Sequence, residues 1–170
     1  AKDTTLAYRD YEARVSYDLT PKDRVSVVSF GSFDYVGQNQ LGIETVLFAS
    51  EFYRVDTRYD HSFGPDTSVR LAVTTGYDQT RIPGQPRNSQ NTMLSARSAF
   101  THVLSERAQV RFGTDAMLEK YTADARPFSD PDDPDTRRFN ALFPARNDVN
   151  LGAWADVRLS LPRWELTPGI

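Results

Sequence analysis

Apolar and polar residues alternate along most of the stretch from Phe52 to Thr80. On each side of the turn sequence Gly64-Pro65-Asp66, alternate residues are mostly apolar or aromatic, with Thr57 and Thr75 as exceptions, and most of the residues between them are charged or small and polar. A period of two places these two sets on opposite faces of a β-strand, and Gly and Pro favour a tight turn between the runs. The pattern therefore predicts a long β-hairpin with one apolar and one charged face.

The same alternation predicts strands on both sides of this hairpin. Tyr11–Leu19 and Arg24–Val36 flank the turn sequence Thr20-Pro21-Lys22-Asp23, which has Pro at a favoured corner position. Near the end of the chain, Leu151–Leu161 alternates in the same way and is followed by a turn and a final short run. We therefore predict an all-β fold of eight antiparallel strands in up-and-down order.

One part of the sequence fits two structures. Thr92–Leu104 and Ala108–Tyr121 alternate around the short link Ser105-Glu106-Arg107, which favours another hairpin. The first of these runs also carries an apolar stripe at helical spacing, and Asp115 is placed to cap a short helix over Ala116–Tyr121. We predict strands in both runs, with helices as the alternative.

The predicted connections alternate between short turns and long loops. The short turns are expected near Pro21, Pro65, Glu106 and Pro162. The long loops, rich in polar residues, Gly and Pro, are expected at Gly37–Glu44, Arg81–Asn91 and Thr122–Asp148. Short turns at one end of a sheet and long loops at the other are typical of transmembrane β-barrels.

Two environments are compatible with an amphipathic sheet. In a soluble protein the apolar set packs inward and the charged set faces water, whereas in a membrane barrel the apolar set faces lipid and the charged set lines a polar lumen. The alternating runs reach about 12 to 14 residues, longer than the roughly 5 or 6 usual in soluble proteins, and tyrosines gather near their ends. These features favour a transmembrane β-barrel, or an eight-strand section of a larger one.

The barrel hypothesis assigns the two sets of strand residues to two surfaces. The charged residues predicted to line the lumen are Glu12, Arg14, Arg54, Asp56, Arg58, Asp60, Arg70, Asp78, Arg97, Arg111, Asp115, Asp156 and Arg158. The residues predicted to face lipid are Tyr53, Val55, Tyr59, Val69, Leu71, Val73, Tyr77, Leu151, Val157 and Leu159. The interleaved Arg and Asp residues predict ion-pair ladders between strands and little ion selectivity.

Composition excludes several classes of function for the single domain predicted over residues 1–170. Hydrophobic residues make up 39% of the chain and the mean hydropathy is −0.55, so no segment offers the roughly 20 apolar residues of a spanning helix. The net charge of −3 gives no basic surface for nucleic acid. The absence of cysteine excludes disulfides and thiolate metal sites.

Catalytic chemistry has few candidates in this sequence. Of the two histidines, His61 and His102, each lies near a predicted turn and belongs to the apolar set. The neighbours of His61 along the strand, Asp60 and Ser62, face the opposite side and cannot form a relay with it. We predict that the chain is not an enzyme and binds no cofactor.

An acidic segment lies within the last predicted loop. It contains Asp130, Asp132, Asp133 and Asp135. Carboxylate oxygens are suitable ligands for Ca²⁺, but the spacing does not match an EF-hand, and two prolines favour an extended, solvated chain. We predict an extracellular loop here and no metal site.

Two stretches carry a resemblance to a known family. The hairpin made by Tyr11–Leu19, Thr20-Pro21-Lys22-Asp23 and Arg24–Val36 resembles those of bacterial outer-membrane β-barrels, and Leu161–Ile170 is similar to strand openings in TonB-dependent receptors. The chain departs from that family in having no plug domain, no TonB-box-like start and no terminal aromatic residue. Because the last run is short and contains Pro168, we expect a section of a larger barrel.

The resemblance implies a location in the bacterial outer membrane and uptake of a small-molecule nutrient such as a metal chelate. It also implies outer-membrane lipid, a plug domain and a TonB-type energising protein as partners outside this segment. Two alternatives stay open: a small passive barrel acting as a porin or surface anchor, and a soluble antiparallel β-protein that binds carbohydrate or a protein partner.

Overall fold

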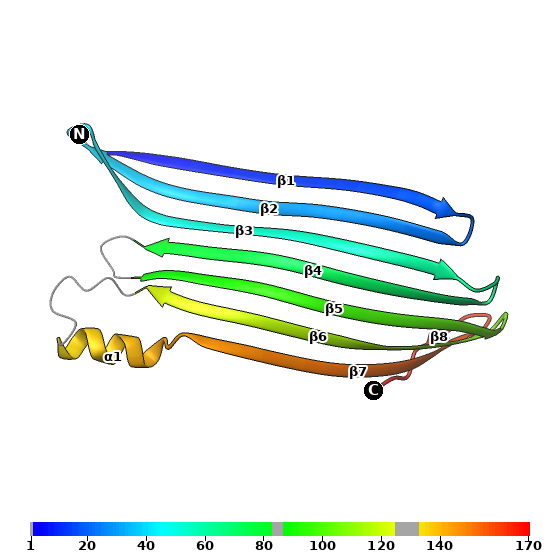
Figure 1. Ribbon diagram of the computed structural model, residues 1–170. Helices are drawn as coiled ribbons and strands as arrows, with labels where there is room; N and C mark the ends of the chain where they lie inside the picture. Colours follow the sequence, from blue (N-terminus) through cyan, green and yellow to red (C-terminus); the bar gives the residue numbers. More distant parts are fainter. Residues whose placement is uncertain (1, 83–86, 125–132) are drawn as a thin grey trace.

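The chain forms one sheet of eight antiparallel strands in up-and-down order, β1 to β8 (Figure 1). The computed structural model describes residues 2–82, 87–124 and 133–170. The strands are β1 Lys2–Thr20, β2 Asp23–Gln40, β3 Ile43–Ser62, β4 Thr67–Ile82, β5 Arg87–Ser105, β6 Ala108–Asp124, β7 Arg146–Ser160 and β8 Glu165–Leu166. The predicted all-β, up-and-down architecture is confirmed. In the part of the chain that the structure describes, the sheet is open, because β1 pairs only with β2 and β8 only with β7.

The strands are longer than the sequence pattern indicated. β1 to β7 contain between 15 and 20 residues, because polar residues beyond each alternating run continue the same pairing. The strand prediction for Thr92–Leu104 and Ala108–Tyr121 is correct, since β5 and β6 pair along nearly their whole length. The helical alternative for these runs is therefore wrong.

The prediction of a long loop at Gly37–Glu44 is wrong. β2 runs to Gln40 and β3 starts at Ile43, so Leu41 and Gly42 alone make the connection. Both residues have positive φ, at 55° and 79°, as a two-residue type I′ hairpin turn requires. The amide-rich flanks look like loop sequence, yet they pair as strand. The turn at Leu41 and Gly42, together with the adjoining ends of β2 and β3 (residues 37–46), is called the β2–β3 tip below.

The other two predicted loops are shorter than expected. Between β4 and β5 only residues 83–86 fall outside the described strands, so most of Arg81–Asn91 is paired. Within Thr122–Asp148, helix α1 covers Pro134–Leu142, which corrects the expectation of an extended chain there. Pro134 occupies the first position of this helix, and Asp133 precedes it. The carbonyl of Asp133 accepts a hydrogen bond from the Arg137 amide at 3.0 Å, an arrangement that favours a helix start. Asp130 and Asp132 lie outside the described residues.

The end of the sheet with the tight turns, called the turn end below, has a repeated hydrogen-bond pattern. The carbonyl of Lys22 accepts from the Ser62 amide at 2.9 Å, and the carbonyl of Asp66 accepts from the Val103 amide at 2.8 Å. Each bond joins the turn of one hairpin to the first strand of the next. The opposite end, which holds α1 and the β2–β3 tip, is called the loop end.

A single sheet has no second layer to bury its apolar side chains. Among the described residues, Ala49 is the only hydrophobic side chain that is buried, and no large side chain is fully buried. Large hydrophobic residues on every strand are exposed, including Leu71, Val73 and Leu151. The fold therefore rests on its backbone ladder and on contacts along each face, without an interior core.

Candidate functional site

Strand register divides the side chains of the sheet between two faces. Residues opposite each other in register project to the same side, and the chain of pairs Arg58–Ala72, Ala72–Arg97 and Arg97–Asp115 carries one face across four strands. The same reasoning places every charged residue predicted for the lumen on this side, called the charged face. Every residue predicted to face lipid lies on the other side, called the apolar face.

Ion pairs cross the charged face between neighbouring strands. Arg111 on β6 donates to both carboxylate oxygens of Asp156 on β7, at 2.8 and 3.0 Å. Arg70 donates to Asp60 at 2.6 Å between β4 and β3. These partners stand directly opposite each other in register, as do Arg97 and Asp115, which also form an ion pair. The predicted ladder of opposite charges is present.

Arg54 makes the most extensive set of contacts on this face. Its guanidinium donates to both oxygens of Asp78, at 2.8 and 2.9 Å, and to the carbonyl of Tyr77 at 3.2 Å. The side chain lies across Gly76, where an added Cβ would sit 2.8 Å from the Arg54 Cδ. Glycine at this position therefore makes room for the arginine to reach the next charge along β4.

Asp56 is the most buried charged residue of the charged face, at 9% exposure. It pairs with Arg58 on its own strand and accepts a hydrogen bond from the Thr74 hydroxyl at 2.7 Å. With two donors, the carboxylate is satisfied without a ligand. Thr74 was not among the predicted site residues, although its place in the polar alternation indicates this face.

Three predicted residues take other positions in the network. Glu12 and Arg14 lie on β1 at the edge of the sheet, and within the described residues neither forms an ion pair. Arg158 pairs with Glu165 of β8 at 2.6 Å, a partner that the sequence analysis did not identify. A further pair on this face, Arg24 with Asp18, was also missed; equal distance from the turn at Pro21 is the signal that would have found it.

The charged face is hollowed by a groove of about 1170 Å³ that extends from β2 to β7. Its charged lining comes from Arg54, Asp56, Arg58, Arg70, Asp78, Arg97 and Asp115. Large apolar side chains that were not predicted as site residues also line it, namely Phe30, Phe52, Met93, Met117 and Trp154. These residues occupy positions of the charged face in the alternation of their strands. The alternation therefore indicates their side of the sheet, although their apolar character alone does not.

The apolar face carries aromatic residues at two levels. Tyr11, Tyr53 and Tyr77 share one row toward the loop end, and the rings of Tyr11 and Tyr53 stack with centroids 6.3 Å apart. The two rings meet over Gly31, where an added Cβ would lie 2.8 Å from each ring. Toward the turn end, the ring of His61 packs against Phe63 with centroids 4.5 Å apart.

Each histidine has one polar side-chain partner near the turn end. His61 Nδ1 lies 2.6 Å from a carboxylate oxygen of Asp23, which also accepts from the Tyr59 hydroxyl at 2.5 Å. His102 Nδ1 lies 2.8 Å from the hydroxyl of Thr67. In the hydrogen bonds of the described residues, no serine hydroxyl meets either ring, and both histidines lie on the apolar face.

The described part of the chain contains no group of three or more His, Cys, Asp or Glu side chains placed to hold a metal ion.

Comparison with protein-family models, with curated proteins and with solved structures finds no match for this chain. Among the described residues, no helix is long and apolar enough to cross a membrane. The two faces of the sheet are therefore the features of this chain that bear on its function.

Proposed function

We propose that this chain forms part of the wall of an outer-membrane β-barrel of the TonB-dependent receptor type, which takes up a nutrient such as a metal chelate. The observation that carries the proposal is the continuous apolar face, which no other part of the described chain covers. Tyr53, Val55, Leu71 and Val73 all remain exposed, at 36 to 47%. Exposed apolar surface of this extent marks an interaction with lipid or with another protein.

The dimensions of the apolar face support lipid as its partner. The aromatic level at Tyr53 and the one at Phe63 are about 33 Å apart along the chain, at roughly 3.3 Å per residue. Strands of membrane barrels tilt by about 40°, which reduces this span to a height of about 25 Å. That height equals the apolar band of outer-membrane barrels, whose two borders carry aromatic girdles.

The charged face supports a water-filled or plugged interior. The groove gives this face the concave curvature expected of an inner wall. Its charges are paired across strands, so the wall is polar but has no large field of one sign. Such a wall suits passage of a hydrated solute or contact with a polar plug domain.

The open edges of the sheet support a larger assembly. In the described chain, the outer edge of β1 has no partner strand, and β7 is paired on its outer side only near residues 155–160. Unpaired backbone groups cost several kcal/mol each in hydrocarbon. We therefore propose that further strands pair with both edges and complete the wall.

The first test asks whether the full-length protein is a membrane barrel. We expect it to fractionate with the outer membrane and to migrate differently on a gel before and after heating, because a closed barrel resists detergent when cold. A protein that is monodisperse and folded in plain buffer would overturn the proposal and favour the soluble β-protein.

The second test asks how transport is energised. Uptake of a labelled metal chelate is measured in cells with and without a functional TonB system. Uptake that requires the system supports a receptor. Diffusion of small solutes through the protein in vesicles, without an energy source, would contradict the receptor proposal and favour the alternative of a small passive barrel.

A further inference from the structure

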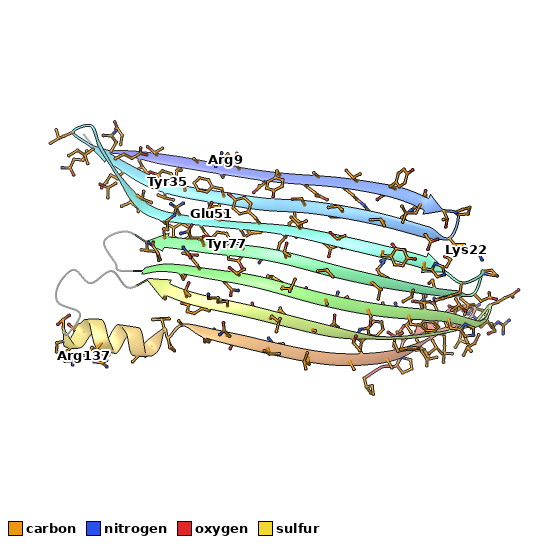
Figure 2. All side chains as sticks on the ribbon, in the orientation of Figure 1. Arg9, Lys22, Tyr35, Glu51, Tyr77 and Arg137 are labelled. Atoms are coloured by element: carbon orange, nitrogen blue, oxygen red, sulfur yellow. The ribbon has the colours of Figure 1, made fainter. Side chains whose placement is uncertain are left out.

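Basic residues are distributed unevenly over the apolar face. Among the strand residues whose side chains the structure describes, Arg9, Arg81 and Lys120 are the Lys and Arg residues that lie on this face. All three lie toward the loop end, at or beyond the row of Tyr11, Tyr53 and Tyr77. Figure 2 shows Arg9 and Tyr77 toward this end of the strands, away from Lys22 in the first tight turn. The three residues are called the basic rim.

The strand residues at the turn end of the apolar face form no such rim, and the basic residues Lys22 and Arg107 lie in the turns themselves. The level of His61 continues through Val69, Phe100 and Phe112 on the neighbouring strands. Its charged residue is Asp23, whose carboxylate accepts from Tyr59 and contacts His61. The described strand residues of the apolar face therefore offer a phosphate no Lys or Arg at this end.

The acidic residues around the basic rim are largely occupied. Glu51 accepts from Arg81 at 3.2 Å and from the Tyr53 hydroxyl at 3.0 Å. Further out on the same face lie Asp3 and Glu44, of which Glu44 accepts from Tyr35 at 2.8 Å. Asp3 and Glu44 therefore lie beyond the level of the basic rim, and Glu51 is engaged by Arg81 and Tyr53.

Two of the basic side chains are not committed to a carboxylate. The guanidinium carbon of Arg9 lies 4.9 Å from the centre of the Phe33 ring, a cation–π contact that leaves its N–H groups available. In the described chain Lys120 forms no ion pair. Amide side chains at the same levels, Gln79 and Gln90, add further donors.

Basic side chains beside an aromatic row are placed to meet the headgroups of a membrane. Their aliphatic stems cover apolar surface while the charged ends reach the polar boundary. We propose that the basic rim binds anionic, phosphate-bearing lipid headgroups in the leaflet at the loop end. This inference rests on the proposed membrane location of the apolar face, and it adds a lipid partner of defined chemistry on one side of the membrane.

The test uses the full-length protein reconstituted into lipid nanodiscs that contain phosphatidylcholine and phosphatidylglycerol. After transfer to detergent, native mass spectrometry counts the lipids that stay bound. We expect phosphatidylglycerol to be retained in preference to phosphatidylcholine, and the double variant Arg9→Gln/Lys120→Gln to lower that preference by at least about fivefold. The control variant Arg14→Gln/Arg97→Gln removes the same charge from the charged face and should keep the preference.

The outcomes separate this inference from the proposed function. Equal retention of the two lipids by the wild type, or the same loss in both double variants, would overturn the basic rim while leaving the membrane barrel in place. Failure of the wild type to enter nanodiscs at all would overturn both proposals.

Discussion

The charged face and the apolar face belong to the same strands but are stabilised in different ways. On the charged face, Asp56 is 9% exposed and is held by an arginine and a threonine of the sheet itself. On the apolar face, Leu71 and Val73 are each 47% exposed and have no layer above them. The comparison shows that the sheet itself supplies the partners of most charged residues on one face, whereas the apolar residues of the other face have no packing partner above them.

The largest effect should come from placing a charge in the middle of the apolar face. Val73→Arg is expected to block membrane assembly, because an arginine facing lipid near the midplane costs about 2–4 kcal/mol. The measurement is the amount of heat-modifiable protein in the outer-membrane fraction.

The next residue supplies the matched control for this substitution. Thr74 lies on the charged face beside Asp56, so Thr74→Arg gains an acidic neighbour and should assemble normally. Equal assembly of the Val73 and Thr74 variants would mean that the two faces do not differ in environment.

A second substitution tests how closely the charged face is packed. At Gly113 an added Cβ would overlap the carbonyl oxygen of Ser98 and lie 2.8 Å from the Trp154 ring. Gly113→Ala should lower the free energy of unfolding by about 1–3 kcal/mol, measured by urea unfolding of the full-length protein in lipid vesicles. Gly152→Ala on the same face is the control, because its nearest neighbour would be 4.0 Å away; a similar loss there would contradict the packing argument.

A third substitution extends the comparison beyond the proposed membrane. Leu41 in the β2–β3 tip has φ of 55° and is 91% exposed. Leu41→Asn should stabilise the tip by up to about 1 kcal/mol, because leucine is strained in this conformation and asparagine tolerates it. Hydrogen exchange of the β2 and β3 amides near the turn measures the gain.

Ile43 is the control for the tip, since it is also exposed, at 70%, but has no positive φ. Ile43→Asn should give no gain in protection from exchange. A gain of the same size at both positions would mean that polarity, and not backbone conformation, determines stability at the tip.

The smallest effect should come from the exposed ion pairs of the charged face. The Arg97 side chain is 66% exposed and that of its partner Asp115 is 39% exposed. Arg97→Ala should therefore change the free energy of unfolding by no more than about 1 kcal/mol, and adding Asp115→Ala should change it little further. Loss of assembly in Arg97→Ala would mean that the ladder is essential to folding.

Alternation was sufficient to predict an all-β, up-and-down antiparallel sheet and the division of its residues between two faces. In the run around Val73 and in the run around Asp56, side-chain direction follows from a period of two, and a one-residue error would have exchanged the faces. The hairpin partners near Pro21 and Pro65 followed because those turns are marked by Pro and Gly.

The features that the sequence analysis missed depend on context that alternation does not carry. Leu41-Gly42 lacks the Asn-Gly or Asp-Gly signature of a type I′ turn, so its polar flanks indicated a loop. The helix at Pro134–Leu142 begins with a capping residue and a proline. A proline is compatible both with the first turn of a helix and with an extended chain, so its presence did not distinguish the two. The Arg158–Glu165 pair depends on the register between β7 and β8. The last run is too short for its alternation to predict that register.

The hydrogen bonds of the turn end make each hairpin an interchangeable module. The Lys22, Asp66 and Arg107 carbonyls each receive an amide from the first strand of the following hairpin. Because the same backbone junction recurs, each hairpin docks on its neighbour through a contact that needs no particular side chain. The width of the sheet is then set by the number of hairpins, since each addition leaves the earlier junctions unchanged.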